Sequence, residues 1–546
     1  MDEIPDRETI SVEFKSDAKK LDDSEIIDAA VGLANADGGA IYLGVEDDGE
    51  ATGVHASHSD IRTLAAFIAN HTVPPLSVSA DKIAAGGRDV VVIRVPKSNA
   101  IVSTAGGKVL RRRIKADGAP ETVPMYPHEY GTRLSSLSLL DFSAQTVMES
   151  SLDDLDPLER QRLRGIIRKN RGEAALLDLV DEDLDKALGI VRIVGDRYVP
   201  TVAGLLLIGR EESIARHVPT AGLDLQALKN TEVKVNDTVS TPLLAAFESA
   251  TAFISAWNSD DEIERGIYRV SVPKFDGRAF REGLANALSH RDYSVMRRVR
   301  VLIDGEGLTI SSPGGFVEGV SLENLLTAEP RSRNPALADA FKRIGLAERT
   351  GRGVDRIFEG SLSYGKPEPS YSGSDPTTVS LFIPSAKPDE AFSKLVSEIV
   401  GEGSDRISVF SLIALHAIRA KGPLDLAAEG GGMTERRVRA AADHLVDLGY
   451  ADMRAKGCRR TYAFSAKAAS MLERGAPKRR GHAGRDAAGA VLELADSRGG
   501  ITRGDVMSLL GVGAPRAYGL LSEMVGEGLL EMSGKNKGAT YRRKNS

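Results

Sequence analysis

The alternation of apolar and polar residues predicts a chain built from both helices and strands. In residues 24–36 and 279–290 the apolar side chains recur every three or four positions, the spacing of one face of a helix. Short apolar runs bounded by paired glycines predict strands at residues 40–45, 90–95 and 109–114. Because helices and strands interleave, the pattern favours a multidomain α+β protein.

The middle of the chain carries further strand signals. Residues 300–303 and 308–310 flank the sequence Asp-Gly-Glu-Gly, which is typical of a β-hairpin turn. A last strand is expected near residues 379–383. Residues 202–209 are apolar throughout and end in glycine, so we expect a buried strand there. This run is far shorter than the roughly 20 apolar residues that cross a bilayer, so no membrane partner is predicted.

The last quarter of the chain repeats one plan twice. Three helices are predicted in each unit: a first helix at residues 406–419 or 484–497, a short second helix, and a third helix at residues 434–448 or 514–527. Strand-like residues follow each third helix and end in an aromatic side chain, Tyr462 or Tyr541. Helices followed by a β-hairpin are the plan of the winged helix-turn-helix, so we expect two such units that bind DNA. Modules for packing or dimerisation are the alternative interpretation.

Length and pattern together suggest four parts. A chain of 546 residues has room for three or four domains that each bury a core. We expect domains at residues 1–140, 150–385, 404–475 and 482–546, the second of them beginning with linker helices.

Composition narrows the class of protein. With 42% hydrophobic and 27% charged residues the chain is neither disordered, collagen-like nor a coiled coil. Its one cysteine, Cys458, excludes a disulfide framework within the chain and a multi-cysteine zinc site, and it fits a reducing compartment. The first residues do not resemble a signal peptide, so we expect a cytoplasmic protein.

Charge is distributed unevenly along the chain. Residues 404–546 contain 24 Lys and Arg against 15 Asp and Glu, whereas the preceding residues contain 47 against 62. A basic end on an acidic body predicts an anionic partner at that end. A basic surface that is merely solvated is the alternative.

One helix carries the most specific chemical pattern. Glu282, Asn286 and His290 are spaced by four residues and therefore share a helix face. An asparagine can offer Mg²⁺ an oxygen ligand, while a glutamate one turn away can orient a water. Glycine turns, where backbone could meet a phosphate, follow at Gly314, Gly315, Gly351 and Gly353.

Residues 280–357 resemble the degenerate GHKL-type ATP-binding domain of RecG-related bacterial regulators. Members of that group read E-x-x-x-N-A-x-x-H-R-D-Y, then (N/S)-P-G-G, S-R-N-P and G-x-G, as this chain does. The resemblance implies an α/β sandwich that binds ATP and Mg²⁺. Asn286 would hold the metal, Glu282 would polarise the water of a slow hydrolysis, and the glycines would surround the nucleotide. The usual D-x-G-x-G is replaced here by Ser312-Pro313-Gly314-Gly315.

The N-terminal segment, about residues 8–130, resembles the Schlafen/AlbA-like DNA-binding domain. The matching residues are Glu13-Phe14-Lys15, residues 34–39, residues 43–49 and Gly53. Together with the GHKL-like part and the winged helices, the resemblance covers nearly the whole chain. It implies a nucleotide-responsive, DNA-binding transcriptional regulator.

Some Schlafen proteins are ribonucleases that use three carboxylates, and the analogous positions here are Glu8, Glu13 and Asp47. Clustered carboxylates bind a divalent metal and activate water against a phosphodiester. A metal-dependent nuclease, acting in defence against foreign nucleic acid, is therefore the alternative function. The competing interpretation pairs Glu13 with Lys15 or Arg112 and makes Asp47 part of a turn. His55, His58 and Asp60 are interpreted as a polar loop rather than a metal site.

Arginines supply the predicted nucleic-acid contacts, because their planar fork binds guanine or phosphate with two hydrogen bonds. In the first domain the candidates are Arg111 and Arg113. In the winged helices they are Arg436, Arg437, Arg439, Arg459, Arg460 and Arg516, with Arg454 and Lys456 beside them. DNA is the predicted partner, with RNA and a second copy of this chain as further candidates.

Overall fold

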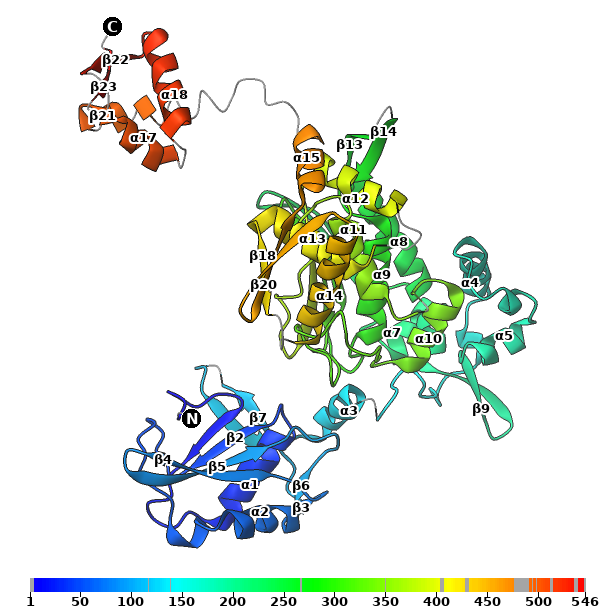
Figure 1. Cartoon of the computed structure of the whole chain (residues 1–546). Helices are drawn as coiled ribbons and strands as arrows, with labels where there is room; N and C mark the ends of the chain where they lie inside the picture. The colour runs from blue at the N-terminus through cyan, green and yellow to red at the C-terminus, as the bar shows by residue number, and fades with distance from the viewer. Residues whose placement is uncertain are drawn as a thin grey trace. The chain divides into compact units, whose positions relative to one another are not determined.

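The fold is described from a computed structural model of the whole chain (Figure 1). It describes residues 4–544 except 116, 138, 266–267, 349, 403–406, 428–431, 476–490, 493, 497, 511–513 and 535–538. Two compact units are present: one holds Met1–Asp389 with Val400–Phe464, the other Glu390–Ile399 with Ser465–Ser546. None of the described helices has the length and apolar character that a membrane span requires.

A four-stranded sheet forms the N-terminal part of the first unit. Its strands are β1 (Val12–Lys15), β2 (Gly39–Leu43), β5 (Arg88–Val95) and β4 (Ser79–Ala85), in that spatial order. Strands β1 and β2 are parallel and the others antiparallel. Helix α1 (Asp23–Ala34) connects β1 to β2, and apolar side chains of α1 and α2 (Ile61–Asn70) pack with those of the sheet into one core.

Local sequence explains where these elements begin. The carboxylate of Asp22 accepts a hydrogen bond from the Ser24 N–H, so Asp22 caps α1 and the helix begins before the expected residue 24. Strand β2 begins at Gly39. A side chain does not fit at this position, because a Cβ would lie 2.1 Å from the Ser11 carbonyl oxygen. The hairpin of β7 (Leu110–Ile114) and β8 (Pro120–Pro124) follows later in the chain.

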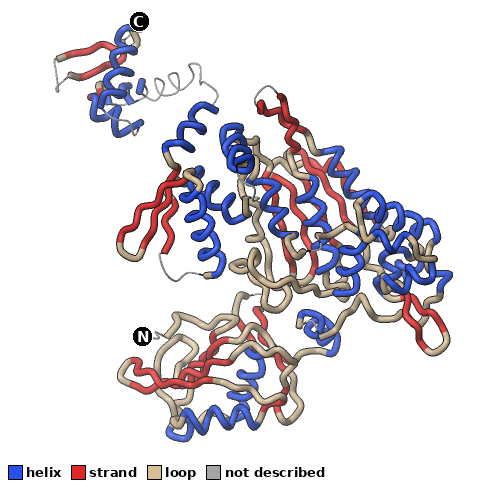
Figure 2. Tube along the Cα trace, turned by 45° about the vertical axis from the view of Figure 1, so that its right-hand side comes forward, coloured by secondary structure: helices blue, strands red, loops and turns tan. Residues whose placement is uncertain are grey.

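A five-stranded sheet is the framework of the central part (Figure 2). Its spatial order is β12 (Glu232–Val239), β11 (Leu223–Lys229), β15 (Val299–Ile303), β16 (Gly307–Pro313) and β17 (Thr378–Pro384). Helix α8 (Leu243–Trp257) contacts β11, and α9 (Gly277–His290) contacts β16. Next to α9 pack α10 (Pro335–Ile344) and α11 (Gly353–Leu362). The mixed α+β, multidomain fold expected from the sequence is confirmed.

The predicted hairpin in this sheet forms as expected, whereas one predicted strand does not. The carboxylate of Asp304 accepts hydrogen bonds from the Glu306 and Gly307 N–H groups and closes the β15–β16 turn. The expected strand at 202–209 is wrong: the structure has helix α6 (Val202–Ile208), buried along its whole length. The Thr201 hydroxyl accepts the Gly204 N–H and starts this helix, and a short run that is apolar on every side has no period to reveal it.

Two helices and a three-stranded sheet end the first unit. The order along the chain is α13 (Val409–Lys421), β18 (Leu424–Ala427), α14 (Met433–Asp447), β19 (Ala451–Lys456) and β20 (Arg459–Phe464). The spatial strand order is β18-β20-β19. Helix α13 packs on α14 and on α11 of the central part.

The second unit repeats this strand pattern with β21 (Ile501–Thr502), β23 (Thr540–Arg543) and β22 (Leu530–Ser533). Helices α17 (Arg503–Leu510) and α18 (Ala514–Gly526) accompany this sheet. Part of the helix expected at 484–497 lies outside the described residues. That both segments are winged helices stays a prediction.

Candidate nucleotide site and candidate nucleic-acid surfaces

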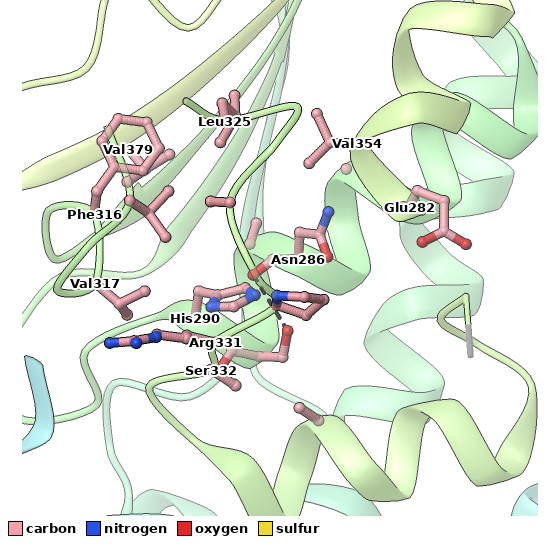
Figure 3. Close-up of a pocket in the computed structure, with 18 of the residues that line it drawn as sticks. Glu282, Asn286, His290, Phe316, Val317, Leu325, Arg331, Ser332, Val354 and Val379 are labelled. Carbon is pink, nitrogen blue, oxygen red and sulfur yellow. Dashed lines mark hydrogen bonds between the residues drawn. The ribbon is translucent and has the colours of Figure 1, made fainter. Parts of the chain in front are cut away.

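Helix α9 turns its predicted functional face toward a cavity of about 230 Å³. The carboxylate of Asp276 caps the helix by accepting the Arg278 and Ala279 N–H groups, which fixes where its turns begin. Glu282, Asn286 and His290 all line the cavity, as a spacing of four on one helix requires (Figure 3).

Glycines keep one end of this cavity open. A Cβ on Gly353 would lie 2.9 Å from Glu282 Oε2 and 3.6 Å from Asn286 Nδ2, so only glycine leaves that space free. Gly353 is also the first residue of α11, whose first-turn N–H groups have no partner within the helix and favour an anion. Gly351, at φ +76°, packs against Pro330 at the same end.

Burial sets the protonation of the titratable groups on α9. Burial raises the pKa of Glu282, although its Oε2 accepts a hydrogen bond of 3.3 Å from the Glu348 N–H. Burial, with the nearby Arg333 and Lys342 cations, lowers the pKa of His290 to about 4. The imidazole facing the cavity is therefore neutral at physiological pH.

The Pro-Gly-Gly turn lies at the end of β16 and lines the opposite side of the cavity. Gly314 has a φ of +98°, and a Cβ on it would lie 2.9 Å from Asp292 Cβ. A Cβ on Gly315 would lie 2.5 Å from the Pro376 carbonyl oxygen. Both glycines thus serve close packing of the backbone as well as lining the cavity.

The Ser-Arg-Asn-Pro motif fixes the end of α9, a role the sequence did not reveal. Arg333 is 2% exposed, and it donates from Nε to the His290 carbonyl and from Nη2 to the Gly315 carbonyl. Asn334 Nδ2 donates to the Ser289 and Arg291 carbonyls. These hydrogen bonds tie the last turn of the helix to the glycine turn. Fully buried polar residues in a motif are a signal of such a structural role.

The N-terminal carboxylates are arranged differently. Glu8 Oε1 accepts the Phe14 N–H at 2.8 Å, and burial raises the pKa of Glu8. Glu13 is buried and forms ion pairs with Arg112 and, at 3.0 Å, with Lys15, as the structural interpretation expected. Asp47 is exposed. Within the described residues, no three or more His, Cys, Asp or Glu side chains are grouped to hold a metal ion.

The His58 imidazole hydrogen-bonds to two carboxylates. Its Nδ1 lies 3.0 Å from Asp17 Oδ2 and its Nε2 lies 3.0 Å from Asp23 Oδ1. His55 contacts Ser57 instead, and Asp60 caps α2. The described contacts of His55, His58 and Asp60 therefore go to three different sets of partners.

Most of the predicted nucleic-acid arginines contact protein groups. On β7, Arg111 pairs with Glu129, and Arg113 pairs with Glu121 at 2.6 Å. In α14, Arg437 lies over the Phe410 ring, Arg439 donates to the Ala427 carbonyl, and Arg436 is exposed.

The β19–β20 hairpin contains both paired and exposed cations. Arg459 pairs with Asp425 and Arg460 with Asp443. Arg454 and Lys456 lie two residues apart on β19, both exposed, and the described residues offer neither of them an ion-pair partner. Alternate residues of a strand share a face, so these two cations form the accessible basic face of the hairpin. Arg516 lies in α18, but its side chain is outside the described residues.

Comparison with known proteins identifies three segments. Residues 8–118 match the family described as "Schlafen, AlbA_2", residues 134–224 match a domain of unknown function, DUF8451, and residues 297–382 match the family described as "Putative ATP-dependent DNA helicase recG C-terminal". The last match includes Gly314, Gly315, Gly351 and Gly353 of the cavity lining but begins after α9.

Solved structures also match the chain, and one of them covers most of it. The crystal structure of the DIP2311 protein from Corynebacterium diphtheriae has 21% sequence identity and a TM-score of 0.49, covering 85% of this chain and 94% of that chain. No curated protein matches the sequence. The family matches therefore identify two parts of the chain: residues 8–118 are similar to the Schlafen, AlbA_2 domain, and residues 297–382 are similar to an ATPase-like domain of the RecG C-terminal type. This combination fits a nucleic-acid-associated, ATP-binding protein.

Proposed function

We propose that this protein is a DNA-binding regulator whose contact with DNA responds to ATP bound in the α9 cavity. The observation that supports the response is the position of residues 316–331. This segment supplies Val317, Val320 and Leu325 to the cavity wall, and it also carries contacts to both parts of the first unit that are candidates for DNA binding.

One contact leads to the N-terminal part. The Glu318 carboxylate lies 3.0 Å from Lys97 Nζ and 3.7 Å from Arg133 Nη1. The backbone N–H of Glu318 donates a hydrogen bond to the Ser136 carbonyl. A second contact leads to α14, where the Thr434 hydroxyl donates at 2.8 Å to the Glu323 carbonyl. A ligand that shifts this segment would act on both contacts at once, which is the physical requirement for coupling two sites.

The residues around Gly353 fit a nucleotide with its metal. The space beside Gly353 adjoins Asn286, whose carboxamide oxygen can hold Mg²⁺, and the N-terminus of α11, whose N–H groups suit phosphate oxygens. Bound Mg²⁺ would neutralise phosphate charge beside the carboxylates of this end. Glu282 can orient a water there only when it is ionised, and burial opposes ionisation, so any hydrolysis is slow.

Calorimetry of the full chain with Mg-ATP tests the binding step. Wild-type protein should bind, and Asn286→Ala should lose the binding with its fold retained. Asn236→Ala is the matched control, because Asn236 lies on β12 and does not line the cavity. Wild-type protein that takes up neither ATP nor ADP at millimolar concentration would refute the proposal.

The coupling step has its own variant. Glu318→Gln keeps the shape of the side chain but removes the charge that attracts Lys97 and Arg133. It should leave ATP affinity close to that of the wild type while reducing the effect of ATP on DNA affinity. An unchanged ATP effect would show that this ion pair does not transmit the response.

A nuclease remains the second candidate, favoured by the proximity of Glu8, Glu13 and Lys15 in the Schlafen, AlbA_2 domain. The ion pair between Glu13 and Arg112 competes with metal for the same carboxylate. Incubation of DNA and RNA with the protein and Mn²⁺ or Mg²⁺ separates the two functions. Cleavage that is lost in Glu8→Gln would establish the nuclease.

A further inference from the structure

The two ends of the α9 cavity differ in chemistry. The acidic lining residues Glu282, Glu348 and Asp355 gather near Gly353: Glu282 accepts the Glu348 N–H, and Asp355 lies in the first turn of α11. Glu329 precedes Pro330, which packs against Gly351 at the same end. All four carboxylates of the lining therefore belong to the end proposed for phosphates and metal.

The opposite wall is apolar and aromatic. Phe316, Val317 and Val379 lie across the cavity from Glu282 and Val354 (Figure 3). Tyr371 lines the cavity as well, with its ring centroid 6.3 Å from that of Phe316. Ile310 and Leu381, neighbours on β16 and β17, also line the cavity, beside Gly283 of α9. Such a surface suits a flat heterocycle that is held by stacking and apolar contact.

Of the three polar groups at this wall, Ser312 can accept a hydrogen bond, while Tyr371 and His290 can each donate or accept one. Ser312 donates its hydroxyl hydrogen to the Ala287 carbonyl at 2.7 Å and keeps lone pairs for accepting. Burial raises the pKa of Tyr371, so its hydroxyl stays protonated and can rotate to either role. His290, neutral as derived above, can present either ring nitrogen as the donor.

Adenine and guanine differ at position 6 of the ring, where one presents an amino donor and the other a carbonyl acceptor. A carboxylate fixed at that point accepts only, and it would reject the carbonyl. Strong discrimination requires a buried polar group that the wrong ligand leaves unpaired. The Tyr371 hydroxyl, which can rotate, and the neutral His290 imidazole can pair with either base.

We infer that the cavity binds purine nucleoside triphosphates through the aromatic and hydroxyl-bearing wall, with little discrimination between adenine and guanine. The inference rests on the proposed function for the phosphate end. It adds the ligand class: a purine triphosphate rather than ATP alone. Such a protein would respond to the total purine nucleotide pool.

Calorimetry of the full-length protein with Mg²⁺ and four ligands tests the inference: ATP, GTP, CTP and inorganic triphosphate. ATP and GTP should bind within about threefold of each other, because no group on the wall is left unpaired by either base. Both should bind at least about tenfold more tightly than triphosphate, because triphosphate has no base to contact the aromatic wall. CTP, with a smaller ring, should fall between.

Phe316→Ala sharpens the test. This substitution should lower the affinities for ATP and GTP by the same factor, about tenfold, and leave the affinity for triphosphate unchanged. Phe382→Ala is the control, since Phe382 lies on β17 but does not line the cavity. Tyr371→Phe keeps the ring and should change the ATP-to-GTP ratio by less than about threefold.

The outcomes of this experiment distinguish failure of the inference from failure of the proposed function. GTP that binds more than about tenfold more weakly than ATP would overturn the inference and leave the proposed ATP response standing. Triphosphate that binds as tightly as ATP would also overturn the inference, because the wall would then contribute nothing. Absence of binding by every ligand would overturn the proposed function itself.

Discussion

The carboxylate of the α9 cavity and the buried carboxylate of the N-terminal domain differ in what surrounds them. In the cavity, Glu282 and Asn286 border a space that Gly353 leaves open. In the N-terminal domain, Glu13 is buried against Arg112 and Lys15. A carboxylate that borders open space is available to a ligand, whereas one neutralised by two cations contributes first to the fold. The contrast shows that a motif gains chemical meaning only with its partners in space.

The largest expected effect comes from breaking the N-terminal ion pair. Arg112→Ala removes a guanidinium that also donates to the Thr9 and Val12 carbonyls, and it leaves Glu13 buried with one partner fewer. The free energy of unfolding of this domain should fall by on the order of 3 kcal/mol. Amide hydrogen exchange of β1 and β2 in the full chain measures the loss.

Arg113→Ala is the matched control for that substitution. Its pair with Glu121 is exposed, so the cost should stay below about 1 kcal/mol. Equal exchange rates in both variants would contradict the structural role given to the Glu13–Arg112 pair.

The next largest effect should come from filling the open end of the cavity. In Gly353→Ala the new methyl group would lie 2.9 Å from Glu282 Oε2, in the space assigned to phosphate. Mg-ATP affinity should fall by at least about tenfold with little change in thermal unfolding. Gly165→Ala, in α4 (Pro157–Lys169), adds the same methyl group where nothing lies within 4 Å, and it should bind as the wild type does. If Gly353→Ala binds ATP as tightly as the wild type does, the phosphates do not bind beside Gly353.

A third effect concerns the exposed cations of the β19–β20 hairpin. Arg454→Ala combined with Lys456→Ala should lower the slope of log affinity against log salt by about two units, one for each phosphate contact. The double variant Arg436→Ala with Arg439→Ala should also weaken DNA binding. Arg439 donates one hydrogen bond to the Ala427 carbonyl, and its other N–H groups can donate to DNA. Fluorescence anisotropy across a salt series measures both. An unchanged slope in both double variants would exclude this segment from the interface.

The smallest effect is a pH dependence at Glu282. Burial raises the pKa of this carboxyl in the folded protein, so the folded state prefers the protonated form and ionisation at neutral pH costs stability. Glu282→Gln should therefore increase the free energy of unfolding at pH 7. The gain should disappear as the pH falls below the ordinary carboxyl range, where both states are protonated. Chemical denaturation at pH 7 and pH 4 measures the free energy of unfolding of Glu282→Gln and of the wild type. A variant less stable than the wild type at pH 7 would contradict the burial argument.

The sequence predicted the cavity better than it predicted the N-terminal cluster. The helical period alone brings Glu282, Asn286 and His290 to one face, so their convergence needs no long-range information. The pairing of Glu13 with Arg112 joins residues almost a hundred positions apart, and the sequence could only offer it as an alternative. The strand expected at residues 202–209 is helix α6 instead, because the uniform apolarity of this run removed the period that would have revealed a helix. The role of Arg333 escaped prediction because its hydrogen bonds go to backbone carbonyls, which no residue pattern displays.

The affinity of the full-length protein for DNA, measured with and without Mg-ATP, tests the central claim most directly. The account predicts that saturating Mg-ATP changes the dissociation constant by about fivefold or more. It also predicts that Asn286→Ala binds DNA but loses the response. A wild-type protein that binds both ATP and DNA, with neither affinity altered by the other ligand, would contradict the account.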